Sequence, residues 1–474
     1  MLKAESNFSL VIFGASGSLA KLKIFPSLYQ LALEGRMPED YVIVGYARSH
    51  KSNEQFRQEF AEAVGDANDM VDHKILNTLL DRVYYVSGQY DDEADFKKLS
   101  EELAAVEKSK DRVRLAYFSI PPSVFDEVIC NLGKTLKQED TPIRLILEKP
   151  FGTDYASAKA LKALLTEHFD VEDLYLLDHY LGKEAVFNLL SLRYANSIFS
   201  HLIQGKYIAN IQITAMESAD IEGRAGYFDT VGIFRDMMQS HIFQILAFLG
   251  MYIPREFTSD LVHKSKVHLL DNLYFNGDPK NLVRGQYEGY LQEEGVAPDS
   301  KAETFAAAKV CIDSANWGEV PIYLRTGKAL KQKWTGVVIE FKDHNFQRKL
   351  DAEVPANKLL IQLQPQEKIE FYLVTKQGGK EMVFNELVTG KPIFCSGDCL
   401  DEHSRLFLEV IRGDHMLFLD FPEIYEAWKV TDPVIELFKK DEVPLDVYER
   451  GGFGPKSADE LIQRDGFEWM NIEM

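Results

Sequence analysis

The chain has 474 residues, which is long enough for two or three domains with sizeable cores. It is 46% hydrophobic and 27% charged, as globular proteins are, and no apolar run reaches the ~18 residues of a membrane span. The formal net charge of −21 argues against nucleic acid or an anionic membrane surface as the main partner, but a small anion held by local cations is still possible.

The cysteines and the amino terminus bear on the cellular compartment. Cys395 and Cys399 have no second Cys or His pair at zinc-site spacing, so we expect no structural zinc. A total of four cysteines indicates a reducing compartment. The first residues, MLKAESNF, lack the long apolar stretch of a signal peptide, and a cytoplasmic protein is expected.

The first third of the chain alternates short apolar strands with helical stretches. The predicted strands cover residues 10–13, 41–46, 83–86, 114–118, 145–147 and 174–177. A helical stretch covers residues 19–33. This alternation predicts an α/β fold with a Rossmann-like, doubly wound parallel sheet.

A glycine loop joins the first strand to its helix. It consists of Gly14, Ala15, Ser16, Gly17, Ser18, Leu19, Ala20 and Lys21. Gly14 permits a tight turn, Gly17 lets the backbone approach a pyrophosphate, and Ala20 lets the helix pack closely on the strand. The loop predicts a dinucleotide site at the helix N-terminus, although an ordinary strand-to-helix turn would look alike.

The end of the second strand indicates which dinucleotide is bound. NAD sites usually have Asp or Glu there, but no acidic residue follows until Glu54. Arg48 can stack on adenine and pair with a 2′-phosphate, and Ser16 can donate a hydroxyl to the same phosphate. NADP is therefore the expected cofactor, with a solvated surface Arg48 as the alternative.

Polar residues follow the sixth predicted strand abruptly. Asp178 stands at the strand end, where open α/β sheets bind ligands. His179 and Lys183 are four residues apart and would share one face of a helix. A carboxylate beside two cation-capable groups suits a site that holds a phosphate and moves a proton. The alternative is a plain helix start, with Asp178 as N-cap and Lys183 in solvent.

After about Asp178 the pattern changes from alternation to helices followed by longer strands. The predicted helices cover residues 183–194 and 230–249, and the predicted strands cover 210–216, 336–341, 359–364 and 369–375. This pattern predicts an α+β domain with a large, mostly antiparallel sheet. We therefore expect two domains, 1–178 and 179–474, with the site in a cleft between them.

His241 is a candidate general base, because the pKa of histidine lies near neutral pH. It falls on the apolar side of the helix predicted over 230–249. Asp236 is five residues earlier, about 140° around an α-helix, so the two would not stack and a partner carboxylate must come from elsewhere. A satisfied core histidine is the alternative.

In their order, these motifs resemble those of the glucose-6-phosphate dehydrogenase family. The resemblance runs through GASGSLAK (14–21), IVGYARS (43–49), GQYDD (88–92), LEKPFGTD (147–154), DHYLGKE (178–184), EGRAGYFD (222–229), RDMMQSH (235–241) and VPIYLRTGKAL (320–330). It implies an oxidoreductase that converts glucose 6-phosphate to the lactone with NADP, the first step of the oxidative pentose phosphate pathway. It also implies a homodimer or homotetramer formed through the C-terminal sheet.

The resemblance also implies roles for individual residues. His241 matches the catalytic base and Asp178 its partner carboxylate. The substrate side matches His179, Tyr180, Lys183, Glu217, Asp236, Lys149, Lys328, Lys333 and Lys23. The cofactor side matches Gly14 to Lys21, Arg48, Tyr90, Asp91 and Lys149. No metal is implied, because the nicotinamide carries the hydride chemistry.

Four positions depart from the residues usual in that family. Ser18 and Leu22 stand where an Asp and a basic residue are usual, which bears on cofactor affinity and preference. Leu176 and Ser240 replace an Arg and an Asn near the catalytic pair. Two other functions stay open: a dehydrogenase of another sugar or phosphosugar, and a non-catalytic NADP-binding paralogue.

Overall fold

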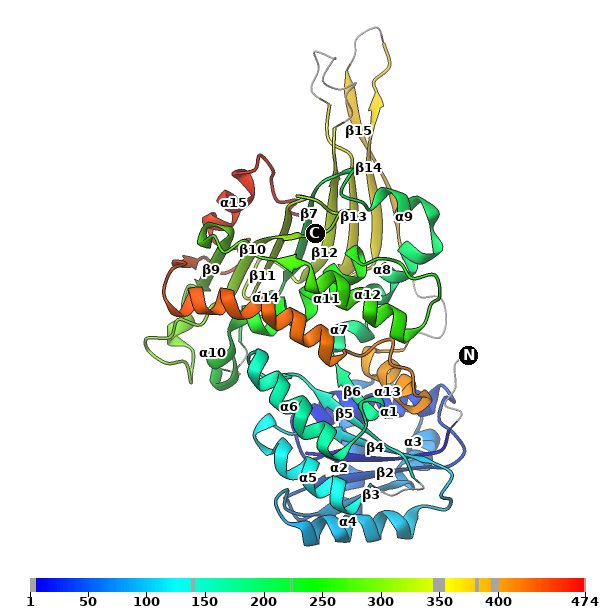
Figure 1. The fold of residues 1–474 in the computed structure, drawn as a ribbon. Coiled ribbons are helices and arrows are strands. Elements are labelled where there is room, and N and C mark those ends of the chain that lie inside the picture. Colours follow the sequence, from blue (N-terminus) through cyan, green and yellow to red (C-terminus); the bar gives the residue numbers. More distant parts are fainter. Residues whose placement is uncertain are drawn as a thin grey trace. The chain divides into compact units, whose positions relative to one another are not determined.

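The computed structural model of the protein describes residues 6–137, 141–221, 223, 225–343, 354–379, 383–393 and 400–472. Cys395 and Cys399, and with them the expectation about zinc, lie outside the described residues. The chain divides into two compact units (Figure 1). The first comprises Met1–Gly152, Ala156–Glu184 and Cys395–Phe421, and the second Thr153–Tyr155, Ala185–Phe394 and Pro422–Met474.

The first unit is built on a six-stranded parallel sheet. Its strands are β1 (Phe8–Phe13), β2 (Tyr41–Ala47), β3 (Val83–Ser87), β4 (Val113–Phe118), β5 (Ile143–Glu148) and β6 (Leu174–Leu177). They lie in the order β3-β2-β1-β4-β5-β6, and every neighbouring pair is parallel. This is the strand order of dinucleotide-binding folds, and the predicted doubly wound sheet is confirmed.

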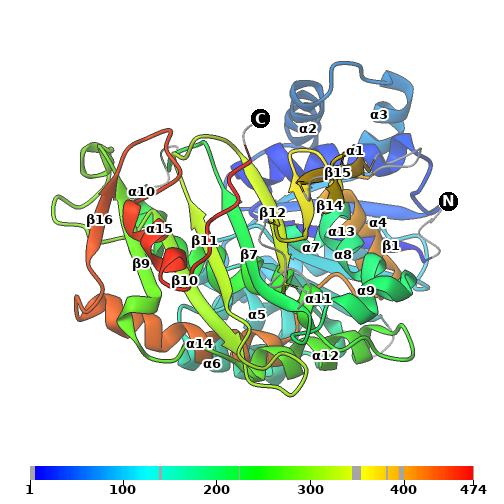
Figure 2. The same cartoon turned by 90° about the horizontal axis from the view of Figure 1, so that it is seen from above.

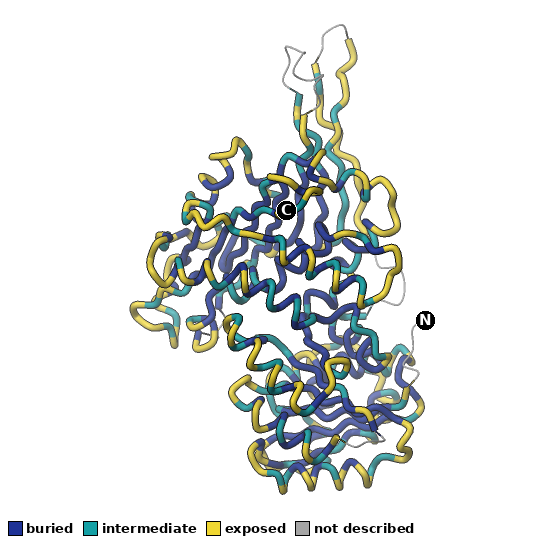
Figure 3. Tube along the Cα trace, in the orientation of Figure 1, coloured by how far each residue is buried: buried dark blue, intermediate teal, exposed yellow. Residues whose placement is uncertain are grey.

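This unit also contains helices, most of which connect these strands. They are η1 (Ala20–Ile24), α1 (Phe25–Leu33), α2 (Asn53–Ala67), α3 (His73–Leu80), α4 (Glu93–Val106), α5 (Phe125–Thr135), α6 (Tyr155–His168), α7 (His179–Gly182) and α13 (Glu402–Arg412). Strands β1, β2 and β4 are buried at every residue (Figure 3), as expected where helices cover both faces of a parallel sheet. The predicted helix over 19–33 is present, but it begins with the π-helical turn η1.

The second unit contains a large mixed sheet. Its strands are β7 (Ile208–Met216), β8 (Leu273–Tyr274), β9 (Leu282–Tyr287), β10 (Phe305–Ile312), β11 (Ile322–Gly327), β12 (Trp334–Phe341), β13 (Lys358–Gln364), β14 (Lys368–Lys376), β15 (Phe384–Pro392) and β16 (Leu445–Tyr448). The order is β15-β14-β13-β12-β7-β11-β10-β9-β16, and Figure 2 shows its central strands side by side. Most pairs are antiparallel, whereas β7–β11 and β9–β16 are parallel, so the predicted mostly antiparallel sheet is confirmed.

Helices of the second unit include one continuous buried run. The helices are α8 (Glu184–Ala195), α9 (Ser197–Leu202), α10 (Ala225–Ile233), η4 (Phe234–Ile242), α11 (Phe243–Gly250), α12 (Ser259–Asp271), α14 (Phe421–Lys439) and α15 (Lys456–Gln463). The helix predicted over 230–249 corresponds to η4 and α11, with a kink at Gly232 before them. Arg193 and Trp317 close the far end of α11 by donating to the carbonyls of Met251 (2.6 Å) and Gly250 (3.0 Å).

The outer strands of the second sheet differ from its centre. Strands β11 and β12 are almost entirely buried, whereas β14 is mostly half-buried and β15 is largely exposed (Figure 3). Within the described part of the chain, no helix is long and apolar enough to cross a membrane.

Candidate active site

The glycine loop has the tight turn that the sequence predicts. Gly14 directly follows β1 with a φ of 80°, and its amide donates to the Tyr46 carbonyl over 2.9 Å. A Cβ atom at this position would lie 2.0 Å from the Ser119 carbonyl oxygen, so only glycine fits. Ala20 is fully buried where the helix meets the sheet, as its small side chain allows.

The open side of this loop fits an anion. A Cβ atom on Gly17 would meet only the Gly14 carbonyl, at 3.1 Å, so backbone or ligand could approach from the other side. Among the described residues, the Ser16 and Ser18 amides make no hydrogen bond. Amides exposed at the start of a helix are suited to a pyrophosphate, and the residues present therefore fit a dinucleotide.

Arg48 stands directly after β2, where an NAD site would have its acidic residue. Its side chain is exposed, and its guanidinium carbon lies 5.8 Å from the centre of the Tyr90 ring. Tyr90 is buried, and burial raises the pKa of its hydroxyl. Asp91, the next residue, is exposed. Because the Arg48 side chain is exposed, its guanidinium is accessible to a phosphate.

A carboxylate near the loop was missed by the sequence analysis. Glu59 on α2 pairs with Lys21 (2.9 Å) and with Lys51 (2.6 Å). Burial would raise the pKa of this carboxyl, but the two lysines hold it below its usual range. No local sequence signal could have identified the pair, because Lys21 and Glu59 lie in different helices.

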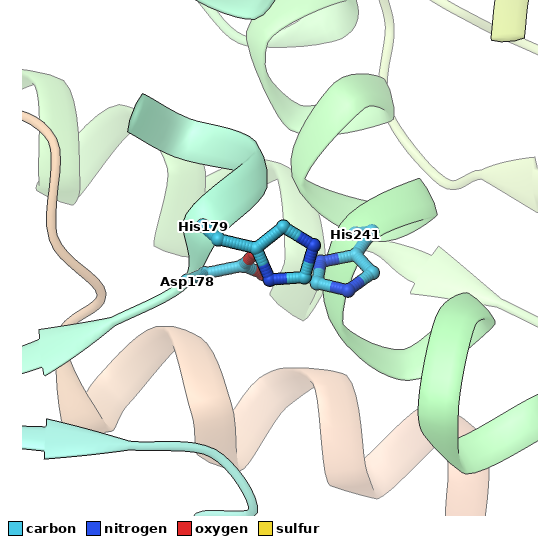
Figure 4. A group of neighbouring side chains, drawn as sticks. All are labelled: Asp178, His179 and His241. Atoms are coloured by element: carbon cyan, nitrogen blue, oxygen red, sulfur yellow. The ribbon is translucent and has the colours of Figure 1, made fainter. Parts of the chain in front are cut away.

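Asp178 caps the short helix that follows β6. It is fully buried, and its Oδ1 accepts from the Tyr180 amide over 2.9 Å. The N-cap alternative is therefore correct for Asp178, and it is compatible with a chemical role. Figure 4 shows the Asp178 and His179 side chains at this junction, and His241 on η4 of the second unit.

The expectation that His179 and Lys183 share a helix face is wrong. Helix α7 ends at Gly182, and Lys183 is extended with a ψ of 130°. The Lys183 Nζ instead lies 3.5 Å from the centre of the Tyr180 ring, where a cation is attracted by the aromatic face. A four-residue helix cannot carry the i to i+4 pair that the spacing suggested.

Two further lysines predicted for the site lie in the first unit. Lys149 directly follows β5 and is half-buried. Lys23 is exposed on η1. Its neighbour Leu22, one of the four departures noted from the sequence, is 71% exposed. Leu176, another departure, is buried within β6 and accepts from the Leu419 amide over 2.9 Å.

In the second unit, two predicted substrate residues meet at one edge of the sheet. Strands β7 and β11 are parallel, with Met216 opposite Gly327, so Glu217 and Lys328 each follow a strand end. The Lys328 Nζ lies 2.5 Å from the Glu217 Oε2, and its side chain is only 3% exposed. Lys333 is exposed just before β12, whose first residue pairs with Met216. All three residues therefore lie near one edge.

His241 and Asp236 lie on the π-helix η4. In a π-helix, hydrogen bonds run from residue i to i+5, so residues five apart are one turn apart. The expectation that these two residues point about 140° apart is therefore wrong, because it assumed α-helical geometry. His241 is buried, Asp236 is half-buried, and the Ser240 hydroxyl donates to the Asp236 carbonyl over 3.2 Å. π-Helical turns of this kind are frequent at functional sites.

Comparison with known proteins identifies relatives of both units. Residues 11–188 match the family model "Glucose-6-phosphate dehydrogenase, NAD binding domain", and residues 190–470 match "Glucose-6-phosphate dehydrogenase, C-terminal domain". Glucose-6-phosphate 1-dehydrogenase of Dictyostelium discoideum is 36% identical over 482 residues, covering 98% of this chain and 95% of its own.

Two solved structures have the same fold throughout. Glucose-6-phosphate 1-dehydrogenase from Mycobacterium avium has a TM-score of 0.87 and 30% identity, covering 99% of this chain and 100% of its own. A glucose-6-phosphate dehydrogenase in complex with glucose 6-phosphate has a TM-score of 0.90 and 33% identity, with the same coverage. The matches thus extend over both domains in their order along the chain.

Proposed function

We propose a specific reaction for this chain, which belongs to the glucose-6-phosphate dehydrogenase family. It oxidises D-glucose 6-phosphate to 6-phospho-D-glucono-1,5-lactone, with NADP as hydride acceptor, as the first step of the oxidative pentose phosphate pathway. The observation that carries the proposal is the segment Asp178–Lys183. It places a buried carboxylate and cationic groups directly after the last strand of a dinucleotide-binding sheet.

His241 is the proposed general base. As hydride leaves C1 of the sugar, a ring nitrogen of His241 takes the proton of the C1 hydroxyl. Asp178 is its proposed partner, which holds the imidazole in one tautomer and stabilises the imidazolium that forms. The N-cap bond from the Tyr180 amide keeps the Asp178 carboxylate in place. The nicotinamide supplies the hydride acceptor when it is bound.

The remaining polar residues divide between the phosphate and the sugar. His179, Tyr180 and Lys183 are the proposed phosphate ligands, and the ring of Tyr180 already orients the Lys183 ammonium. Glu217 and Asp236 accept from sugar hydroxyls, whereas Lys328 donates. The other proposed cations around the substrate are Lys149, Lys333 and Lys23.

NADP is the proposed nucleotide because of Arg48. Its exposed guanidinium can pair with a 2′-phosphate, and the Ser16 hydroxyl can donate to the same group. The amides and side chains from Gly14 to Lys21 surround the pyrophosphate, and Tyr90 and Asp91 complete the nucleotide side. NAD is usable at higher concentration, because the contacts of the loop with the pyrophosphate are the same for both nucleotides.

We also propose a cytoplasmic homodimer that forms through the sheet of the second unit and can pair into a tetramer. Strands β14 and β15 carry exposed apolar side chains, among them Leu373, Leu387 and Val388, at 40%, 45% and 48% exposure. Leu373 and Leu387 are directly opposite each other in the β14–β15 pair and therefore share one face of the sheet. An apolar patch on a sheet face is typical of an interface. Analytical ultracentrifugation of the wild type and of Leu387→Asp tests this, and a monomeric wild type would overturn it.

A turnover assay decides between the proposed reaction and its alternatives. Reduced-cofactor absorbance is followed with glucose 6-phosphate or glucose, each with NADP or NAD. We expect the fastest turnover with glucose 6-phosphate and NADP. Equal turnover of glucose would indicate another sugar dehydrogenase, and binding of NADP without turnover of either sugar would indicate a non-catalytic paralogue.

A further inference from the structure

We propose that Glu303 is a positioning residue for the reaction. It anchors the first turn of the π-helix η4, which carries His241, while the next residue, Thr304, anchors Lys328. The inference rests on the proposed function only in the roles that it gives to His241 and Lys328. The anchoring itself is a property of the second unit.

Glu303 binds the start of η4 through both its backbone and its side chain. Its carbonyl oxygen accepts from the Ile233 amide over 2.9 Å, and its Oε1 accepts from the Phe234 amide over 3.0 Å. The first amides of a helix have no partner within that helix, so a carboxylate from outside satisfies one of them. The negative charge also suits the positive end of the helix dipole.

The chain bends around this carboxylate at Gly232. This glycine has a φ of 70°, in the left-handed region, and it separates α10 from η4. A Cβ atom there would lie 2.3 Å from the Glu303 Oε1. No other residue fits between the bend and the carboxylate, so the entry to η4 is shaped around Glu303.

Thr304 extends the same support to the substrate side. Its carbonyl oxygen accepts from the Lys328 amide over 2.9 Å. The Tyr448 hydroxyl lies 2.8 Å from the Thr304 Oγ1 and also 2.8 Å from the Lys328 carbonyl oxygen. Two consecutive residues before β10 therefore hold both the helix of the proposed base and the lysine that pairs with Glu217.

A buried carboxylate is costly, which argues for a specific role. Glu303 is buried, and burial raises the pKa of its carboxyl, with Arg235 and Arg284 as the nearby cations that oppose this. The reacting groups of an enzyme tolerate little displacement, since a shift of ~1 Å can lower the rate ~10²-fold. Helix η4 carries the proposed base, but only one of the several proposed substrate ligands, Asp236. A rigid anchor at the start of η4 therefore affects turnover more than it affects substrate binding.

Steady-state kinetics and glucose 6-phosphate binding by calorimetry test this with Glu303→Ala and Glu303→Gln in the full-length protein. We expect Glu303→Ala to lower kcat at least ~10-fold, with less than a ~3-fold change in the dissociation constant. Glu303→Gln keeps an acceptor oxygen for the Phe234 amide, so its kcat should stay within ~3-fold of the wild type. Tyr448→Phe should instead raise KM, because it loosens Lys328.

Trp317→Phe is the matched control for a general loss of stability. It removes the Trp317 hydrogen bond to Gly250 at the opposite end of the same helical run and leaves Glu303 untouched. If Trp317→Phe lowers kcat as much as Glu303→Ala does, Glu303 has only a structural role. If Glu303→Gln is as slow as Glu303→Ala, the acceptor oxygen for the Phe234 amide is not what anchors η4. Either result overturns the proposal.

Hydrogen exchange separates this inference from the proposed function. Glu303→Ala should raise exchange of the η4 amides at least ~10-fold above the wild type, whereas Trp317→Phe should leave η4 within ~3-fold. An inactive wild type whose η4 exchange still responds to Glu303→Ala would refute the reaction and keep the anchor. Unchanged η4 exchange would refute the anchor whatever the activity.

Discussion

The two units position their predicted functional residues in different ways. In the first, the functional groups come from short segments that directly follow strands, namely the glycine loop, Arg48 and Asp178–Lys183. In the second, they come from distant segments held together by buried contacts, such as Lys328 with Glu217 and Phe234 with Glu303. A local motif therefore identifies the first set, whereas only the folded sheet or a family resemblance identifies the second.

The exposure of the two sets differs in the same way. Arg48 and Lys23 of the first unit are exposed cations, suited to capture a charged ligand. His241 and Lys328 of the second unit are buried, with side chains fixed by packing. We therefore expect changes in the first unit to act mainly on binding, and changes in the second to act on kcat or on stability.

The largest expected effect tests the second unit. His241→Asn should lower kcat about 10²–10⁴-fold, the usual contribution of a general base, and leave glucose 6-phosphate affinity nearly unchanged. Stopped-flow or steady-state kinetics with calorimetric binding measures both. A variant that retains more than about a tenth of wild-type kcat would remove His241 from the mechanism.

A stability prediction addresses the same unit. Glu423 is buried between His263 Nδ1 (2.5 Å) and Lys266 Nζ (2.8 Å), and Lys266 is also fully buried. Glu423→Gln leaves the Lys266 charge without its counterion, so the free energy of unfolding should fall by about 3–5 kcal/mol in denaturant titrations. A loss below about 1 kcal/mol would mean that the ion pair is not coupled to folding.

The same group gives a pH dependence with a definite sign. Burial raises the pKa of the Glu423 carboxyl, but Lys266 and His263 outweigh it, so the folded pKa lies below the usual 4.5. The stability that results is present above about pH 4.5 and is lost as the pH falls through the folded pKa. The wild type should therefore lose this stability in acid, and Glu423→Gln should show a flatter curve.

Asp178→Asn tests whether a change at a buried group of the first unit lowers kcat, as changes at buried groups of the second unit are expected to do. Asn caps a helix about as well as Asp, so α7 should persist, but the imidazole would lose its anionic partner. We expect kcat to fall about 10²-fold, less than for His241→Asn, because the base survives in a poor orientation. An unchanged kcat would limit Asp178 to its N-cap role.

The first sheet could be predicted from the sequence, and so could the strands β7, β12, β13 and β14 of the second, because their patterns are local. The strands β8 to β11, β15 and β16 were not predicted. The alternation of strands with helices gave the strands from β1 to β6, and the apolar run around His241 gave η4 and α11. The two errors at the candidate site have one physical cause, since they depend on helix geometry that composition does not encode. Helix α7 is too short to pair His179 with Lys183, and the π-helical turn of η4 changes the angle between Asp236 and His241.

Tertiary pairings could not be predicted from the sequence, for another reason. Glu59 with Lys21, and Glu303 with Phe234, join residues far apart in the chain, and neither Glu59 nor Glu303 stands in a recognisable motif. Glu217 and Lys328 were each expected at the site only from resemblance. The structure adds their ion pair and its cause, the parallel register of β7 and β11.

Lys183→Ala tests the binding role of the first unit. Hydrogen bonds to charged groups contribute about 1.5–3 kcal/mol, so the dissociation constant for glucose 6-phosphate should rise about tenfold to a hundredfold. Binding of unphosphorylated glucose should change little. Lys97→Ala on α4, an exposed lysine paired with Glu93, is the control and should change neither. Equal weakening of both sugars would mean that Lys183 does not hold the phosphate.

The smallest expected effect concerns the choice of nucleotide. Arg48 is exposed, so its pair with a 2′-phosphate should lie near the lower end of the range for charged hydrogen bonds, about 1.5 kcal/mol or tenfold. Arg48→Ala should therefore raise KM for NADP about tenfold and leave KM for NAD nearly unchanged, narrowing the preference without abolishing activity. Arg82→Ala is a matched control, because this arginine also lies over an aromatic ring, 4.5 Å from the centre of Tyr41, but away from the glycine loop. If Arg48→Ala weakens both nucleotides equally, the guanidinium only stacks on adenine. The first unit would then bind the pyrophosphate through its loop without distinguishing the two nucleotides.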